Sequence, residues 1–386
     1  LGNLIYFYDD NRISIEGSTD LTFTEDRAQR FAAYGWQVLT VEDGNEDLDA
    51  IRKALEEAKE DKKRPTLIKV RTTIGYGSPN KANTHAAHGS PLGPDEVKAS
   101  KENLGWPVEP AFYVPDDVLD HFREAVGQGK QKQDAWGKLV EGYRAEYPEL
   151  AETWDMIWAG KLPEGWEKSL PVFSPDNGAI PTRKASGSVL NALAPVIPNL
   201  IGGSADLAPS TNTYMKEAGE QQAQSPGGRN IRFGVREHAM GAIVNGMAYH
   251  GGVIPFGGTF LTFSDYMRGA LRVSALAHLH VIWVYTHDSV WLGEDGPTHQ
   301  AVEHISALRA IPNLTVIRPA DANETAAAWK IALENATSPT ALILTRQNVA
   351  ELPGKTYAEQ YSLALQAEKG AYIVPVSYTH LTLPTN

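Results

Sequence analysis

The feature that most restricts the fold is a succession of strand, helix and strand near the start of the chain. Apolar runs at residues 36–41 and 66–70 have the length of buried strands. Between them, apolar residues recur at helical spacing from Leu48 to Ala58, with Asn45 as the candidate N-cap. Strands joined by a helix of this length are parallel and form a right-handed crossover, so the pattern predicts an α/β fold.

The same alternation returns after a less regular middle segment. A further strand is expected at residues 4–8, before the first crossover. In residues 103–176 Pro and Trp scatter among charged helical pieces such as 134–147, which we interpret as an ordered interdomain connection. Strand-like runs then alternate with helical segments at residues 200–201, 230–233, 253–255, 280–285, 314–317 and 341–344. The chain is therefore predicted to hold two α/β domains, with parallel sheets flanked by helices.

Composition excludes several classes of protein. The net charge is −12 and no long block of Lys or Arg occurs, so nucleic acid is excluded as a partner because its phosphates would be repelled. The absence of cysteine excludes disulfides and thiolate metal sites. No apolar run reaches membrane-spanning length, and no membrane partner is expected. The start, Leu1 to Tyr8, has neither an initiator Met nor a signal peptide, which is typical of a piece of a longer chain.

Polar residues gather in the segment THDSVWLGEDGPTHQ, residues 286–300, directly after an apolar strand. In α/β folds, ligands bind beyond the carboxyl ends of the strands, where this segment would lie. Its two histidines, three acids and two glycines could converge on a polar substrate. A solvated loop is the alternative for any single residue, and the density of such residues in one loop favours a site.

Two neighbouring segments contain further candidates. Glu237, in GVREHAM, lies at a predicted junction of strand and helix, where a partly buried carboxyl group could share a proton. An acid is also common at a helix start because it suits the helix dipole. In GGTFLTFSDY, Phe260, Phe263 and Tyr266 recur every third residue and would share one face of a helical turn, either in a core or around a cofactor.

These segments, in this order and spacing, resemble the transketolase family over nearly the whole chain, to about Ile373. The resemblance implies that residues 1–102 are the C-terminal part of a diphosphate-binding domain, which is then incomplete. Residues 103–176 would be the connection and 177–352 the pyrimidine-binding domain. Residues 353–386 would begin a linker to a missing C-terminal domain and end in either a tail or a non-native junction.

The resemblance implies thiamine diphosphate as the cofactor. In the family, the glutamate that matches Glu237 hydrogen-bonds the pyrimidine ring nitrogen and favours the imino tautomer. The aromatic residues that match Phe260, Phe263 and Tyr266 wrap the pyrimidine ring. His88, which follows a Gly-rich loop, matches a residue close to both the diphosphate and the substrate, where it would stabilise an oxyanion or move protons.

A magnesium site is implied by the segment YDDNRISI, which resembles the closing half of the family's metal motif. The matching ligands are the Asn11 side chain and the backbone oxygen of Ile13, and such oxygen donors suit Mg²⁺, or Ca²⁺ or another divalent ion. The opening Gly-Asp-Gly would lie upstream of Leu1, so we expect this chain to lack it. Taken without the family, Asp-Asp-Asn after a strand predicts only a turn.

Substrate binding is implied for six residues besides His88, of which the arginines, the serine and the first histidine match phosphate-binding positions. The last histidine and the aspartate match groups that contact the sugar hydroxyls and the reacting oxygen, and both histidines are catalytic candidates. The six are Arg183, Ser210, His287, Asp295, His299 and Arg346. Each arginine alone is typical of a surface. Within residues 286–300, Val290-Trp291 stands where a smaller pair is expected from the family, which leaves substrate preference open.

Three functions remain open at this point. The family's reaction moves a two-carbon ketol unit from a ketose phosphate to an aldose phosphate through an enamine on the cofactor, in the pentose phosphate pathway or the Calvin cycle. A relative similar to dihydroxyacetone synthase would use formaldehyde as acceptor, and a truncated chain could be a non-catalytic dimerising fragment. The resemblance also implies a homodimer with the active site at the subunit interface, in the cytoplasm, or in a plastid if a transit peptide has been lost.

Overall fold

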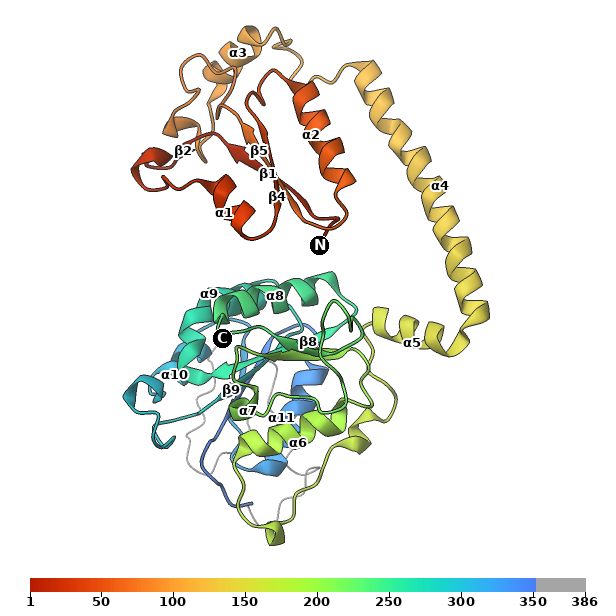
Figure 1. Cartoon of the computed structure of the whole chain (residues 1–386), viewed down its shortest axis with the longest axis vertical. Coiled ribbons are helices and arrows are strands. Elements are labelled where there is room, and N and C mark those ends of the chain that lie inside the picture. The colour runs from red at the N-terminus through yellow and green to blue at the C-terminus, as the bar shows by residue number, and fades with distance from the viewer. Residues whose placement is uncertain (352–386) are drawn as a thin grey trace. The chain divides into compact units, whose positions relative to one another are not determined.

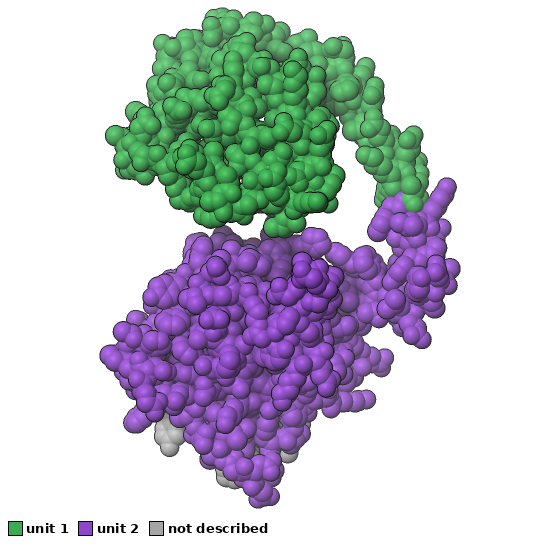
Figure 2. All heavy atoms as spheres, in the orientation of Figure 1, with its two compact units in different colours: residues 1–135 green, residues 136–386 purple. Residues whose placement is uncertain are grey.

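The computed structural model describes residues 1–351 of the chain. They divide into two compact units, unit 1 at residues 1–135 and unit 2 from residue 136 onward, coloured green and purple in Figure 2. The division falls inside a long helix, α4 (Asp116–Glu146). The predicted linker and tail, residues 353–386, lie outside the described residues.

Unit 1 is built on a parallel three-stranded sheet in the order β1-β5-β4 (Figure 1). Its strands are β1 (Ile5–Asp10), β4 (Gln37–Val41) and β5 (Thr66–Arg71), with a small hairpin of β2 (Ile13–Ser14) and β3 (Gly17–Ser18). Its helices are η1 (Thr19–Leu21), α1 (Arg27–Ala33), α2 (Leu48–Glu60), η2 (His85–Ala87), α3 (Pro94–Asn103) and the first part of α4. The predicted crossover of strand, helix and strand is confirmed.

Helix α2 buries its apolar stripe against this sheet. Ala54 and Ala58 pack on Ile68 and Val70 in the core of unit 1. The predicted N-cap, Asn45, is wrong, because the helix begins later and the side chain of Asp47 accepts the capping hydrogen bond from the Ala50 amide at 2.8 Å. Asn45 instead pairs with Thr73, to which it donates at 3.1 Å and from whose amide it accepts at 3.0 Å.

Unit 2 contains a six-stranded parallel sheet within the described residues, in the order β10-β11-β9-β8-β6-β7. Its strands β8 and β9 are labelled in Figure 1. Its strands are β6 (Leu200–Ser204), β7 (Asn230–Arg232), β8 (Ile254–Phe260), β9 (Ile282–Thr286), β10 (Thr315–Ile317) and β11 (Thr340–Leu344). Its α-helices are α5 (Pro148–Trp158), α6 (Thr182–Leu193), α7 (Ala208–Thr211), α8 (Glu237–His250), α9 (Arg268–Leu276), α10 (His304–Arg309) and α11 (Ala322–Glu334). Short 3₁₀ helices are η3 (Trp166–Ser169), η4 (Pro175–Asn177), η5 (Leu261–Met267) and η6 (Pro297–His299). The predicted α/β class is confirmed.

Both faces of the unit 2 sheet are covered. Trp329 of α11 packs with Leu190 of α6 and Phe256 of β8 on one side, and its indole donates to the Ser186 hydroxyl at 2.8 Å. A second cluster, which includes Met240 of α8, fills the other side under α8 and α9. Burial on both faces is what a parallel sheet requires, and it explains why these strands are continuous apolar runs.

Strand β8 is longer than predicted and reaches Phe260 rather than ending at Pro255. Glycine weakens the sequence signal for a strand, and two glycines lie here. A Cβ at Gly257 would approach Trp283 to 3.1 Å, and one at Gly258 would approach Thr213 to 2.9 Å. The neighbouring side chains therefore need glycine at these positions. None of the described helices is both long enough and apolar enough to cross a membrane.

Candidate active site

Three aromatic rings form a stack at the carboxyl end of β8. Phe260 ends the strand, and Phe263 and Tyr266 follow on η5. Ring centroids are 5.7 Å apart both from Phe260 to Phe263 and from Phe263 to Tyr266. A 3₁₀ helix has three residues per turn, so side chains at this spacing align on one face. The sequence spacing therefore corresponds to a continuous aromatic surface, with Phe260 buried and Tyr266 exposed.

Two histidines extend this surface. His287, directly after β9, lies with its ring 4.4 Å from that of Phe260. The ring of His299, which ends η6, is 5.1 Å from that of Phe263. Residues near both ends of the loop 286–300 therefore contact the aromatic stack. We refer to these five rings as the aromatic cluster.

Glu237 is the first residue of α8 and is buried. Its Oε1 accepts a hydrogen bond from the Thr259 hydroxyl at 3.2 Å. Thr259 is the chain neighbour of Phe260, so this bond ties the carboxyl group to the strand that carries the aromatic cluster. The start of a helix favours a negative group through the peptide dipoles.

The imidazole of His287 lies among charged groups. Its Nε2 is 3.7 Å from the Asp295 carboxylate, and its Nδ1 is buried without a hydrogen-bond partner among the described residues. Burial, with positive charge on Arg183 and then on Arg346, lowers the pKa of His287 to about 4, against an opposing effect of Asp295. His287 is therefore neutral near pH 7 and can donate or accept one hydrogen bond at each nitrogen.

The charges of two arginines from different elements act on His287. Arg183, at the start of α6, donates from Nη1 to the backbone oxygen of Ser210 at 2.8 Å. Arg346, after β11, pairs with Glu294 at 3.1 Å. Burial, and then the charge of Arg346, lowers the pKa of Arg183. The charge of each arginine opposes that of the other even with Glu294 and Asp295 nearby, so the pair could accept a further anion such as a phosphate.

One of the three acids of residues 286–300, Asp288, received no role of its own in the sequence analysis. Asp288 is buried and receives two hydrogen bonds from Arg318, at 2.9 and 2.6 Å, and one from Gln347 at 3.3 Å. Arg318 directly follows β10, and a cation at the carboxyl end of a strand is the signal that could have drawn attention to it. Thr259 was missed as well, and nothing in its sequence context marks it.

The metal candidates lie in unit 1, at the carboxyl end of β1. Asn11 follows the strand, and its Oδ1 accepts a hydrogen bond from the Ile13 amide at 2.9 Å. Arg12 between them has a φ of 60°, a left-handed conformation that closes the turn. The backbone after β1 therefore forms the turn that the sequence predicts when the family is left aside. The same turn brings the amide oxygen of Asn11 close to Ile13, and both residues carry hard oxygen atoms of the kind that Mg²⁺ prefers.

His88 also belongs to unit 1, where it directly follows the short helix η2 and is exposed. The preceding Gly-rich loop follows β5, and Gly75 and Gly77 both have positive φ. A Cβ at Gly77 would come within 2.6 Å of Leu104, so the loop needs glycine to pack there. The structure thus places Asn11, Ile13 and His88 in one unit and the other predicted site residues in unit 2.

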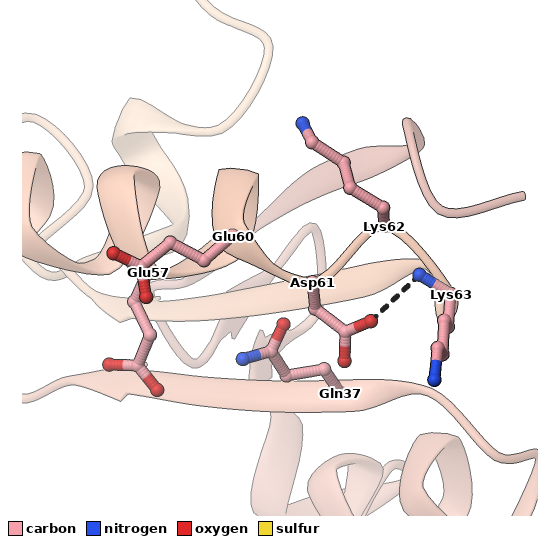
Figure 3. A pocket seen from close by; sticks show the side chains of 6 residues that line it. All are labelled: Gln37, Glu57, Glu60, Asp61, Lys62 and Lys63. Carbon is pink, nitrogen blue, oxygen red and sulfur yellow. Dashed lines mark hydrogen bonds between the residues drawn. The ribbon is translucent and has the colours of Figure 1, made fainter.

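Two other groups stand apart from these residues. A cavity of about 530 Å³ in unit 1 is lined by Gln37, Glu57, Glu60, Asp61, Lys62 and Lys63 (Figure 3). It lies at the amino ends of the strands, because Gln37 begins β4. In unit 2, Asp265 and Glu303 face opposite nitrogens of His304, at 3.1 and 3.8 Å.

Comparison with known proteins identifies the family. Residues 1–163 match the model described as transketolase, thiamine diphosphate binding domain, and residues 178–351 match transketolase, pyrimidine binding domain. The chain belongs to the transketolase family. The transketolase of Nostoc sp. (strain PCC 7120) is 54% identical over 377 residues, which are 97% of this chain and 55% of that protein. The chloroplastic transketolase of Craterostigma plantagineum is 51% identical over 375 residues, 97% of this chain and 71% of that protein.

Solved transketolases share the fold. The Pichia stipitis transketolase in complex with sedoheptulose 7-phosphate has a TM-score of 0.89 and 47% identity, over 94% of this chain and 54% of that one. The Leishmania mexicana transketolase gives the same TM-score and identity, over 92% of this chain and 53% of that one. The chain spans about half the length of the first curated relatives that it matches.

Proposed function

We propose that the whole protein is a transketolase, which transfers a two-carbon ketol unit from a ketose phosphate such as xylulose 5-phosphate to an aldose phosphate such as ribose 5-phosphate. The observation that carries the proposal is the meeting of the aromatic cluster, a buried carboxyl group and two arginines at one sheet edge. Pichia stipitis transketolases solved with sedoheptulose 7-phosphate, fructose 6-phosphate and xylulose 5-phosphate support this substrate class. The pentose phosphate pathway or the Calvin cycle would use the reaction.

The residues of unit 2 fit the pyrimidine end of thiamine diphosphate. When bound, this cofactor supplies the carbon nucleophile that receives the ketol unit. Glu237 would share a proton with the pyrimidine ring nitrogen, and Thr259 would hold its carboxyl group in the direction needed. Phe260, Phe263 and Tyr266 would stack against the ring, as their shared face allows.

The phosphate of the substrate would bind between the arginines. Arg183 and Arg346 offer planar donor groups, and Nε of Arg183 is buried without a partner among the described residues. Ser210, whose backbone is held by Arg183, would donate its hydroxyl to the same phosphate. An anion bound there would offset the electrostatic repulsion between the two arginines.

Histidines would act on the sugar. His287 and His299 border the aromatic cluster, and Asp295 lies beside His287. We assign Asp295 and His299 to the sugar hydroxyls and the reacting oxygen, with His287 between the sugar and its phosphate. His88 of unit 1 would stabilise an oxyanion or move a proton near the diphosphate.

Unit 1 would hold the divalent ion that accompanies the cofactor. Asn11 and the carbonyl of Ile13 would provide two of the ligands, and the remaining oxygens would come from the cofactor and from groups other than these two. Mg²⁺ is the ion we expect, with Ca²⁺ as the alternative. Residues 1–102 and 177–352 would then be the diphosphate-binding and pyrimidine-binding domains, joined by 103–176.

We further infer a homodimer with the active site at the subunit interface. Helix α8 exposes Ile243 and Tyr249, and α9 exposes Val273 and Leu276, so the two helices carry apolar side chains away from the core of unit 2. Exposed apolar residues that gather on neighbouring helices mark association surfaces.

The compartment proposed is the cytoplasm, or a plastid as in relatives named chloroplastic. Cell fractionation decides between these two compartments.

A transfer assay with the full-length enzyme tests the proposal. Xylulose 5-phosphate is the donor, and ribose 5-phosphate and formaldehyde are compared as acceptors. A transketolase gives sedoheptulose 7-phosphate at a much higher kcat/KM than it gives dihydroxyacetone. A preference for formaldehyde would instead indicate the dihydroxyacetone synthase reaction, and no transfer to either acceptor would refute ketol transfer.

A further inference from the structure

Asp288 is a buried carboxylate that the proposed reaction does not use. Its Oδ2 accepts from Nε and Nη2 of Arg318 at 2.9 and 2.6 Å. Its Oδ1 accepts from the Ser289 hydroxyl at 3.2 Å and from the side-chain amide of Gln347 at 3.3 Å. Four hydrogen bonds occupy the lone pairs that a carboxylate offers, so Asp288 has no capacity left for a substrate.

The partners of Asp288 come from three adjacent strands. Asp288 follows β9, Arg318 follows β10 and Gln347 follows β11, and these strands are neighbours in the order β10-β11-β9. All three are parallel, so their carboxyl ends meet at the same edge of the sheet. One carboxylate therefore links three loops that are distant in the sequence.

Two of the linked loops carry residues of the proposed phosphate site. His287 is the chain neighbour of Asp288, and Arg346 is the chain neighbour of Gln347. We propose that Asp288, paired with Arg318, is a positioning residue that sets the spacing of His287 and Arg346 and thereby the preference for phosphorylated substrates. This inference rests on the proposed function, because it concerns the same site.

The ion pair suits this role better than a neutral contact. The charge of Arg318 compensates that of Asp288, so the buried carboxylate adds little repulsion toward a phosphate a few residues away. Removing one partner would leave the other partly buried and uncompensated, and the loops would shift to relieve it. Displacing a binding group by about 1 Å is enough to lower a rate about 100-fold.

The test uses the full-length enzyme with the variants Asp288→Asn, Arg318→Lys and Gln347→Leu. Arg229→Gln is the matched control, because Arg229 is a partly buried arginine of the same unit that donates to the carbonyls of Ala194, Ile197 and Leu200 near the start of β6. KM and kcat are measured for xylulose 5-phosphate and for unphosphorylated xylulose, together with the thermal unfolding midpoint and thiamine diphosphate affinity.

We expect Asp288→Asn to raise KM for xylulose 5-phosphate about tenfold or more, with little change for xylulose or in cofactor affinity. Arg318→Lys, which retains the charge, should raise it less, and Gln347→Leu the least. Arg229→Gln should lower the unfolding midpoint without altering the ratio of the two KM values. The inference would be overturned if Asp288→Asn changed both KM values equally. It would also be overturned if Arg229→Gln changed the ratio of the two KM values as much as Asp288→Asn does.

A binding measurement separates this inference from the proposed function. Calorimetric titration with xylulose 5-phosphate does not require turnover, so it applies even if the wild-type enzyme transfers nothing. Weaker binding in Asp288→Asn and in Gln347→Leu, beside unchanged binding in Arg229→Gln, supports the positioning role. Unchanged binding in a folded Asp288→Asn or, where that variant does not fold, in Gln347→Leu, refutes it.

Discussion

The carboxyl edges of the two sheets hold their candidate residues by different means. In unit 2, side chains from several strands contact one another, as the aromatic cluster and the Asp288 network illustrate. In unit 1, Asn11 is held by a turn within its own segment, and His88 is exposed. Long-range contacts fix geometry against loop motion, whereas a local turn fixes only its own backbone. Unit 2 is therefore the preorganised part.

The cores differ in the same sense. Every residue of β8, β9 and β11 is buried, whereas Tyr6 and Phe7 of β1 are about half exposed. A parallel sheet normally buries both faces, so β1 presents an apolar surface that is suited to cover by further protein. Changes to large side chains should consequently cost more stability in unit 2.

The largest expected effect is on the unit 2 core. Trp329→Ala removes a fully buried indole and its bond to Ser186, and should lower the free energy of unfolding of unit 2 by about 3–5 kcal/mol. Denaturant unfolding with a probe in each unit measures it. Trp158→Ala, at a half-exposed residue of α5, is the control and should change little. Similar losses in both variants would mean that burial in the unit 2 core does not decide the cost, and the reasoning behind the comparison would fail.

The next effect concerns the phosphate site. Arg346→Ala removes a charged donor and should cost about 1.5–3 kcal/mol in substrate binding, seen as a raised KM for phosphorylated substrates in the full-length enzyme. Unphosphorylated xylulose is the control substrate. An equal rise of KM for both substrates would contradict the phosphate role.

A smaller effect should appear in the pH dependence of stability. The pKa of His287 is about 4 in the folded chain and about 6.5 when unfolded, so the unfolded state binds more protons between these values. The contribution of His287 is complete above pH 6.5 and is lost as pH falls toward 4. Unfolding of His287→Asn should therefore depend less on pH in this window. An unchanged slope would argue against a buried neutral imidazole.

The smallest effect is expected on β1. Phe7→Ser alters a half-exposed side chain of β1. In the 386-residue chain, with no further protein against β1, it should change the free energy of unfolding of unit 1 by less than about 0.5 kcal/mol. The same variant measured in the full-length enzyme shows whether β1 is covered there. A loss above about 2 kcal/mol in that setting would indicate burial of Phe7.

The sequence predicted the α/β class and the approximate strands, because parallel strands buried on both faces are continuous apolar runs. It predicted the aromatic stack through its three-residue spacing. It missed the end of β8, where the packing partners of Gly257 and Gly258 come from distant segments. It did not indicate the pairing of Asp288 with Arg318 for a similar reason, since an ion pair across 30 residues leaves no local pattern. Asn45 failed as a cap because Thr73, from another loop, competes for it.

The most direct test of the account is the ketol-transfer rate of Glu237→Gln in the full-length enzyme. Glutamine keeps the shape of the side chain and the contact with Thr259 but does not share a proton in the same way. We predict that the rate falls about 10²–10⁴-fold, while thermal unfolding and thiamine diphosphate binding stay close to those of the wild type. A rate near that of the wild type would contradict the assignment of Glu237 and, with it, the proposed active site.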